Sequence, residues 1–245
     1  MDRNETYIYN GNIRVRRTFL GEVIDEISAK RNFDTTEREL FTFSAMLAAA
    51  LASEIKDDEG SVFVSLKAPT GGKVATAFCE TDGRLRGYAD LKPADPLTDG
   101  SYLLTVGIRL YVRGDYQSTV TADTPEKAAL AYFINSAQTK AAIKINYGKE
   151  SQMYLCEYLP GHDVNTTEQV KAELKDKKDM LEIALTEAQK DPESVAEMAK
   201  QTETPIVYGC TCSKRKLRAI FESQGITVEE GMEAECRLCG KVYAF

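Results

Sequence analysis

Apolar residues along the chain follow two periods, and the change from one to the other predicts the order of helices and strands. Near the start, Tyr7–Tyr9 and Asn12–Arg16 flank Asn10-Gly11, a pair that favours the two positive φ angles of a type I′ turn. We therefore predict a β-hairpin here. A helix is expected to follow it from about Thr18 to Arg31.

The strongest helix pattern comes next. Asp34, Thr35 or Thr36 can cap it, and Asp34 stands three residues before Glu37, which is the spacing of a capping box. The apolar run over Leu40–Ile55 forms a stripe on one side of this helix, and the other side is rich in alanine. The run is too short and too interrupted for a membrane span. We expect a helix that is buried on both sides.

From Ser61 onward the apolar residues alternate with polar ones, which is the period of a strand. Strands are expected over Ser61–Lys67, Lys73–Thr81, Arg84–Ala89, Tyr102–Val112, Tyr116–Ala122, Ala141–Tyr147 and Gln152–Tyr158. Thr124 is expected to cap a further helix, with Pro125 in its first turn, that runs to about Ala137. Because helices and strands mix without strict alternation, the predicted fold class is α+β, with a mixed sheet and helix N-terminal domain.

The character of the sequence changes at Gly161. The segment that follows is charged, prone to form helices and free of aromatic residues. One helix is expected after Asp163 or Asn165, and a second is expected at Asp191-Pro192. Two interpretations remain open: a solvated helical linker, or a segment that folds only while its apolar stripe has a packing partner. The predicted domains are thus 1–161, a helical linker over 162–205, and a small C-terminal domain over 206–245.

Four of the six cysteines lie in this C-terminal part, as Cys210-x-Cys212 and Cys236-x-x-Cys239. Two close pairs at such a separation are a common layout for a tetrahedral Cys₄ zinc site. Between the pairs, Ser213 is expected to cap a helix, while the second pair is expected at the turn of a hairpin. So short a domain cannot bury enough apolar surface to fold alone, so a metal would supply the missing stability.

The spacing of the four cysteines does not by itself decide the chemistry of this site. A Cys-x-Cys pair can bind a metal, and it can also close a small disulfide. Basic residues near the four cysteines would favour the thiolate, which is the reactive form. These basic residues are Lys214, Arg215, Lys216, Arg218, Arg237 and Lys241. A structural zinc ribbon and a thiolate centre that an oxidant can open are both consistent with the pattern.

Composition and charge narrow the function classes. The chain has 245 residues and a net charge of −7, which disfavours nucleic acid as the main partner. Its N-terminal residues are polar, so we expect a cytoplasmic protein with reduced thiols. His162 is the single histidine, which excludes a multi-histidine metal centre. Cys79 and Cys156 fit no ligand spacing and are expected to be small buried apolar residues.

The tail CTCSKRKLRAIF…ECRLCGKVYAF resembles the C-terminal zinc-binding region of the heat-shock protein 33 family, which are redox-regulated holdase chaperones. Its aromatic ending, Tyr243-Ala244-Phe245, is also typical of that family. The segments LAAALASEIK, GGKVATAFCETDGRLRGYAD and EYLPG resemble further landmarks of the family. The resemblance thus extends over most of the chain.

This resemblance implies that Cys210, Cys212, Cys236 and Cys239 hold one Zn²⁺ in the reduced state. It also implies that an oxidant forms the disulfides Cys210–Cys212 and Cys236–Cys239, that the tail and linker then unfold, and that apolar surface becomes available to unfolded or misfolded client proteins. It further implies a chaperone that is not an enzyme and a homodimer in the oxidised form. We expect binding without ATP, because the sequence contains no nucleotide-binding motif. Neither nucleic acid nor a membrane is an expected partner.

The main alternative is a zinc-ribbon adaptor or nucleic-acid-binding protein with a static structural zinc. The basic segment SKRKLR favours this alternative. A thiol oxidoreductase would instead need Cys-x-x-Cys at a helix N-terminus within a thioredoxin-like unit. Because Cys236 and Cys239 are expected on a hairpin, we give that class the least weight.

Overall fold

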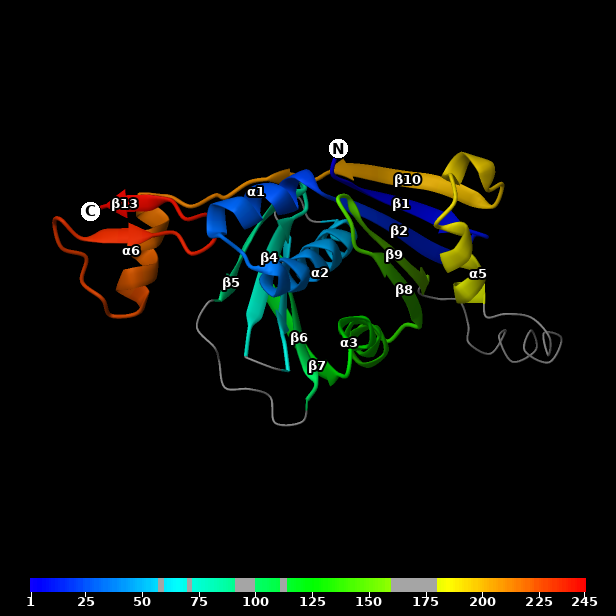
Figure 1. Cartoon of the computed structure of the whole chain (residues 1–245), viewed down its shortest axis with the longest axis horizontal. Helices are drawn as coiled ribbons and strands as arrows, with labels where there is room; N and C mark the ends of the chain where they lie inside the picture. The colour runs from blue at the N-terminus through cyan, green and yellow to red at the C-terminus, as the bar shows by residue number, and fades with distance from the viewer. Residues whose placement is uncertain (57–59, 70–71, 91–99, 111–113, 160–179) are drawn as a thin grey trace.

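The computed structural model describes residues 1–56, 60–69, 72–90, 100–110, 114–159 and 180–245 (Figure 1). Five strands of the described residues form a first sheet in the order β10-β1-β2-β9-β8. These strands are β1 (Arg3–Tyr9), β2 (Ile13–Leu20), β8 (Ala141–Asn146), β9 (Ser151–Tyr158) and β10 (Met198–Pro205). The predicted first hairpin is confirmed, because Asn10 and Gly11 have φ angles of 52° and 72°.

A second sheet lies beside the first. Its strands have the order β11-β5-β4-β3-β6-β7, and β11 pairs with β5 in parallel while the other pairs are antiparallel. They are β3 (Ser61–Lys67), β4 (Val74–Glu80), β5 (Arg84–Asp90), β6 (Tyr102–Leu110), β7 (Gly114–Ala122) and β11 (Val207–Tyr208). The predicted α+β fold class is confirmed.

The helix α2 (Thr35–Ala52) lies between the two sheets, and its apolar residues form the centre of the core (Figure 1). Asp34 and Glu37 make the predicted capping box, in which each side chain accepts from the other residue's backbone N–H at 2.9 Å. Phe41, Phe43 and the alanines on the opposite side are all buried, as expected for a helix that is apolar all round.

The first helix begins later than predicted. Residues 18–20 continue β2 and pair with β9, and α1 spans Glu22–Arg31. Its N-cap residue, Gly21, has no side chain to cap the helix. The carboxylate of Asp2 replaces it, accepting from the N–H groups of Gly21 and Val23 at 2.9 and 2.7 Å. This cap comes from a residue distant in sequence, so local patterns did not reveal where the helix starts.

The helix α3 (Pro125–Tyr132) packs against β6 and β7. The hydroxyl of Thr124 accepts from the N–H of Lys127 at 3.2 Å, which confirms the predicted cap. The helix then continues as the π-helical turn η1 (Phe133–Ala137), so the predicted end of the helical segment is also confirmed.

The segment before β10 differs from its prediction. The helix expected after Asp163 or Asn165 lies outside the described residues, and α5 spans Met180–Glu187. The helix expected at Asp191-Pro192 is wrong: a single 3₁₀ turn, η2 (Pro192–Ser194), is followed by the strand β10. Backbone pairing with β1 outweighs the local helix preference of this segment.

An apolar cluster forms where α5 covers the outer face of the first sheet, and we call it the outer-face cluster. It consists of Tyr7, Tyr9, Ile13, Val15, Tyr154 and Cys156 from the sheet, with Leu181, Ala184, Ala188, Val195 and Met198 from the covering segment. The cluster is separate from the core around α2. In the described part of the chain, no helix combines the length and the apolar character that crossing a membrane requires.

Candidate metal centre

Two short turns bring the four C-terminal cysteines together. Cys210 and Cys212 follow β11 and precede α6 (Lys214–Ser223), which Ser213 caps as predicted. Cys236 and Cys239 lie at the turn between β12 (Glu233–Glu235) and β13 (Val242–Ala244), which pair antiparallel.

That second turn is tight. The N–H of Gly240 donates to the carbonyl of Cys236 at 2.7 Å, and the N–H of Cys236 donates to the carbonyl of Lys241 at 2.8 Å. Gly240 has a φ of 75°, a conformation that favours glycine. The predicted hairpin around the second cysteine pair is confirmed.

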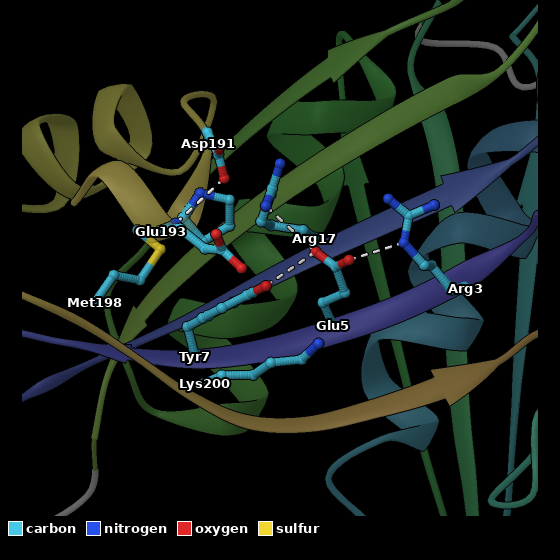
Figure 2. Close-up of a pocket in the computed structure, with 9 residues that line it drawn as sticks. Arg3, Glu5, Tyr7, Arg17, Asp191, Glu193, Met198 and Lys200 are labelled. Atoms are coloured by element: carbon cyan, nitrogen blue, oxygen red, sulfur yellow. Dashed lines mark hydrogen bonds and ion pairs between the residues drawn. The ribbon is translucent and has the colours of Figure 1, made fainter.

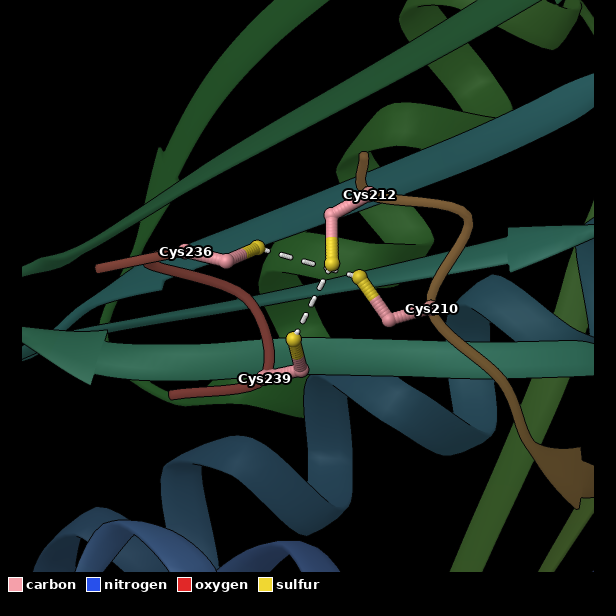
Figure 3. A group of neighbouring side chains, drawn as sticks. All are labelled: Cys210, Cys212, Cys236 and Cys239. Atoms are coloured by element: carbon pink, nitrogen blue, oxygen red, sulfur yellow. Dashed lines mark hydrogen bonds between the residues drawn. The ribbon is translucent and has the colours of Figure 1, made fainter. Parts of the chain in front are cut away.

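The four sulfur atoms face one another across a small space (Figure 3). All lie within 4.8 Å of one another, with Cys210 and Cys236 at 3.8 Å and Cys212 and Cys239 at 3.4 Å. A tetrahedral zinc with bonds of about 2.3 Å places its sulfur ligands about 3.8 Å apart. The four side chains therefore fit a Cys₄ zinc site, and the distances exceed the roughly 2 Å of a disulfide bond.

Tyr243 contacts this group from β13. Its hydroxyl lies 3.1 Å from the sulfur of Cys212 and donates to the carbonyl of Cys212 at 3.0 Å. Burial by itself would raise the pKa of Cys212, but hydrogen bonds with Tyr243 and the other thiols lower it to about 7. Burial raises the pKa of Cys210. From the sequence, Tyr243 was identified only as part of an aromatic ending, and no role at the site was predicted for it.

Several of the predicted basic residues lie over aromatic rings beside the site. Lys214 and Arg218 lie 5.4 and 5.7 Å from the ring centre of Phe245, and Lys241 lies 5.1 Å from that of Tyr243. Lys241 therefore lies over the ring whose hydroxyl contacts Cys212. Positive charge at that place would partly offset the negative charge of thiolates around a divalent ion.

The second cysteine turn docks on the N-terminal part of the chain through Arg31, in the last turn of α1. The guanidinium of Arg31 contacts the carboxylate of Glu235 at 2.6 Å and donates to the carbonyl of Arg237 at 2.6 Å. The guanidinium of Arg237 lies 4.2 Å from the ring centre of Tyr88 in β5. Sequence reasoning missed these contacts, because nothing in the local pattern around Arg31 indicates a partner so distant in sequence.

The other two cysteines are buried in strands, as predicted. Cys79 in β4 belongs to the core around α2, and Cys156 in β9 belongs to the outer-face cluster. Burial raises the pKa of each thiol to about 12. Neither thiol belongs to the four-cysteine group. His162 lies outside the described residues.

Comparisons with known proteins agree with this geometry. A family model described as Hsp33 protein matches residues 4–245. The 33 kDa chaperonin of Latilactobacillus sakei subsp. sakei strain 23K is 29% identical over 177 residues, which are 67% of this chain and 57% of that relative. The matched stretch thus spans little more than half the length of that curated relative.

The crystal structure of the 33 kDa chaperonin, a heat shock protein 33 homolog, from Thermotoga maritima superposes with a TM-score of 0.69. The match covers 99% of this chain and 94% of that one at 15% sequence identity, so it shows the shared fold. The family model covers all but the first three residues, including the four clustered cysteines. The chain therefore belongs to the Hsp33 family.

Proposed function

We propose that this protein is a redox-regulated, ATP-independent chaperone that holds unfolding proteins under oxidative stress. In the reduced state, Cys210, Cys212, Cys236 and Cys239 would hold one Zn²⁺. The observation that supports this best is the meeting of four sulfur atoms within 4.8 Å of one another. The bound metal would supply folding free energy to a C-terminal domain, residues 206–245, that has little core of its own.

The described residues connect this site to a covered apolar surface. From the cysteines the chain runs back through β11 and β10 to α5, which packs on the outer-face cluster. If the C-terminal domain unfolds, the linker, residues 162–205, loses an anchor at one end. Loss of α5 together with the segment through Met198 would then uncover Tyr7, Tyr9, Ile13 and Val15 on the sheet. A contiguous apolar patch of this kind is suited to binding exposed apolar segments of clients.

The activating step is a two-electron oxidation of each cysteine pair. Peroxide takes two electrons from a pair of thiolates and two protons from water, one S–S bond forms, and the peroxide is reduced to two molecules of water. Once both pairs are oxidised, the Zn²⁺ that the four sulfurs would hold loses its ligands and is released. We propose the pairs Cys210–Cys212 and Cys236–Cys239. Because all four sulfurs are mutually close, proximity in the folded site does not select a pairing. The resemblance to the family supports these pairs, in each of which the two cysteines are near neighbours in the sequence.

The proposed oligomeric state, location and partners are inferred from membership of the Hsp33 family and from the net charge of the chain. The oxidised form is expected to be a homodimer in the cytoplasm that acts as a binding protein rather than an enzyme. The net charge of −7 argues against nucleic acid as a partner, and a membrane is not expected as one either.

One observation favours a second candidate, a nucleic-acid-binding protein with a static zinc. The basic residues Lys214, Arg215, Lys216 and Arg218 are all exposed along α6. Such a protein would bind polyanions equally well before and after treatment with peroxide, and it would not suppress client aggregation. These two properties separate it from the proposed chaperone.

The direct test follows bound zinc and aggregation of a thermally unfolding client during peroxide treatment. We expect zinc release to track suppression of aggregation. Alanine at all four C-terminal cysteines should abolish zinc binding, whereas Cys79→Ala and Cys156→Ala should retain it. Equal suppression by the fully reduced, zinc-loaded protein would contradict the redox switch.

A further inference from the structure

The edge strand β10 is held to the first sheet almost entirely by its backbone. Among its eight side chains only that of Met198 is buried. Its sequence, MAKQTETP, contains Ala, Lys, Glu and Pro, which are less frequent in strands than elsewhere. The strand conformation of this segment therefore depends on pairing with β1 and not on the residues that the segment contains.

The outer face of the sheet beside β10 is incompletely filled. A pocket of about 550 Å³ lies there between the sheet and the turn η2, and its lining includes Tyr7, Arg17, Glu193, Met198 and Lys200 (Figure 2). The pairing also shifts register in the middle of β1, which leaves Gln201 without an opposite residue. A strand with different side chains on the outer face of the sheet would therefore find room at this edge.

The backbone groups of β1 that face β10 can be identified from the two ends of the pairing. The N–H of Ile206 donates to the carbonyl of Asp2 at 2.9 Å, and the N–H of Asn10 donates to the carbonyl of Glu197 at 3.0 Å. In an antiparallel strand, successive residues direct their N–H and C=O groups alternately to the strand on one side and to the strand on the other. Thr6 and Ile8 therefore also direct these groups toward β10. The residues between them direct theirs toward β2.

We propose that β1 is a docking edge for clients, to which an extended segment of an unfolding polypeptide adds in the place of β10. The inference rests on the proposed function, because β10 must be released together with the linker. Pairing through the backbone requires no particular client sequence, and β10 itself shows that a strand with few apolar side chains is accepted here. Alternate client side chains would reach the outer-face cluster, as Met198 does.

Hydrogen exchange of the full-length protein, followed amide by amide by NMR, tests this docking edge. The amides of Thr6 and Ile8 should exchange faster after oxidation, since β10 has left. A short synthetic peptide of alternating valine and threonine should then slow them again by about tenfold or more. The amides of Tyr7 and Tyr9, which face β2, should stay protected throughout. The matched control is the same peptide with every backbone nitrogen methylated, which should give no protection.

A variant pair provides a second readout. Ile8→Pro removes an N–H that faces β10, so that β1 lacks this donor once release of β10 makes it the edge strand, whereas Ile8→Val keeps that N–H. The oxidised Ile8→Pro protein should bind the peptide about tenfold more weakly than the Ile8→Val protein. The comparison of the two peptides on the unmodified protein does not depend on whether the proline variant folds.

The outcomes separate the docking edge from the proposed function. If the oxidised protein suppresses client aggregation while the peptide protects neither Thr6 nor Ile8, the docking edge is wrong and the chaperone function stands. Equal binding of the methylated peptide would also overturn the docking edge. If oxidation releases zinc without any suppression of aggregation, the proposed function itself fails, and the docking edge fails with it.

Discussion

At the scale of single residues, one hydroxyl group connects the two halves of the cysteine site. Tyr243 comes from β13, yet it contacts both the sulfur and the carbonyl of Cys212, which belongs to the first cysteine turn. Groups that hydrogen-bond to a metal ligand hold it in the correct orientation. Tyr243 would therefore position Cys212 for the metal.

Removing this hydroxyl gives the first prediction. Tyr243→Phe should lower zinc affinity by about tenfold or more, because Cys212 loses the hydrogen bond that orients it. Competition with a chromogenic chelator measures the affinity. Tyr116→Phe, which removes an equivalent hydroxyl from the exposed face of β7, is the matched control and should bind zinc like the unmodified protein. An unchanged affinity in Tyr243→Phe would show that the hydroxyl has no positioning role.

The sequence predicted the residues of this site better than it predicted their surroundings. Spacing alone identified the four cysteines. Local turn chemistry identified the cap Ser213 and the hairpin at the second cysteine pair, both of which depend only on near neighbours. The contacts of Tyr243 and Arg31 depend on how distant segments meet. No local pattern contains that information, so these two residues became apparent only in the folded chain.

At the scale of elements, α5 and β10 attach to the same sheet in different ways. The helix contributes buried side chains to the outer-face cluster, whereas the strand contributes mainly backbone groups. This difference explains why the helix predicted at Asp191-Pro192 was wrong. The local residues of β10 do not favour a strand, and the pairing that imposes one comes from β1, which lies almost two hundred positions earlier in the sequence.

A charge placed beneath α5 should uncover the outer-face cluster without oxidation of the four cysteines. Ala184 is fully buried in the outer-face cluster, so Ala184→Glu would bury an unpaired carboxylate and displace the helix. We expect the reduced variant to suppress client aggregation while it still holds zinc. Thr186→Glu, on the exposed side of α5, is the matched control and should stay inactive until oxidised.

Alkylation of Cys156 reports whether Ala184→Glu has displaced the helix, because that thiol lies beneath α5. If Cys156 becomes reactive in the reduced variant and aggregation is nevertheless not suppressed, the outer-face cluster is not a client-binding surface.

At the scale of the whole molecule, residues 198–208 connect both sheets to the cysteine site. This segment pairs with β1 through β10 and with β5 through β11. Gly83 permits the crossing, since a Cβ atom there would come within 2.0 Å of the carbonyl oxygen of Pro205. Arg31 attaches the second cysteine turn to α1. Unfolding of the C-terminal domain would therefore remove two attachments that help to hold the linker in place. These are the pairing of β11 with β5 and the contacts of Arg31.

The central claim is that oxidation of the four-cysteine site uncovers the outer face of the first sheet. Two native thiols test it directly: Cys156 lies beneath α5 in the outer-face cluster, while Cys79 lies in the core around α2. After timed peroxide treatment and quenching, a pulse of alkylating reagent and mass spectrometry measure modification of each thiol alongside zinc release. The account predicts that Cys156 becomes modified as zinc is released while Cys79 stays protected. Full zinc release with Cys156 still protected would contradict it.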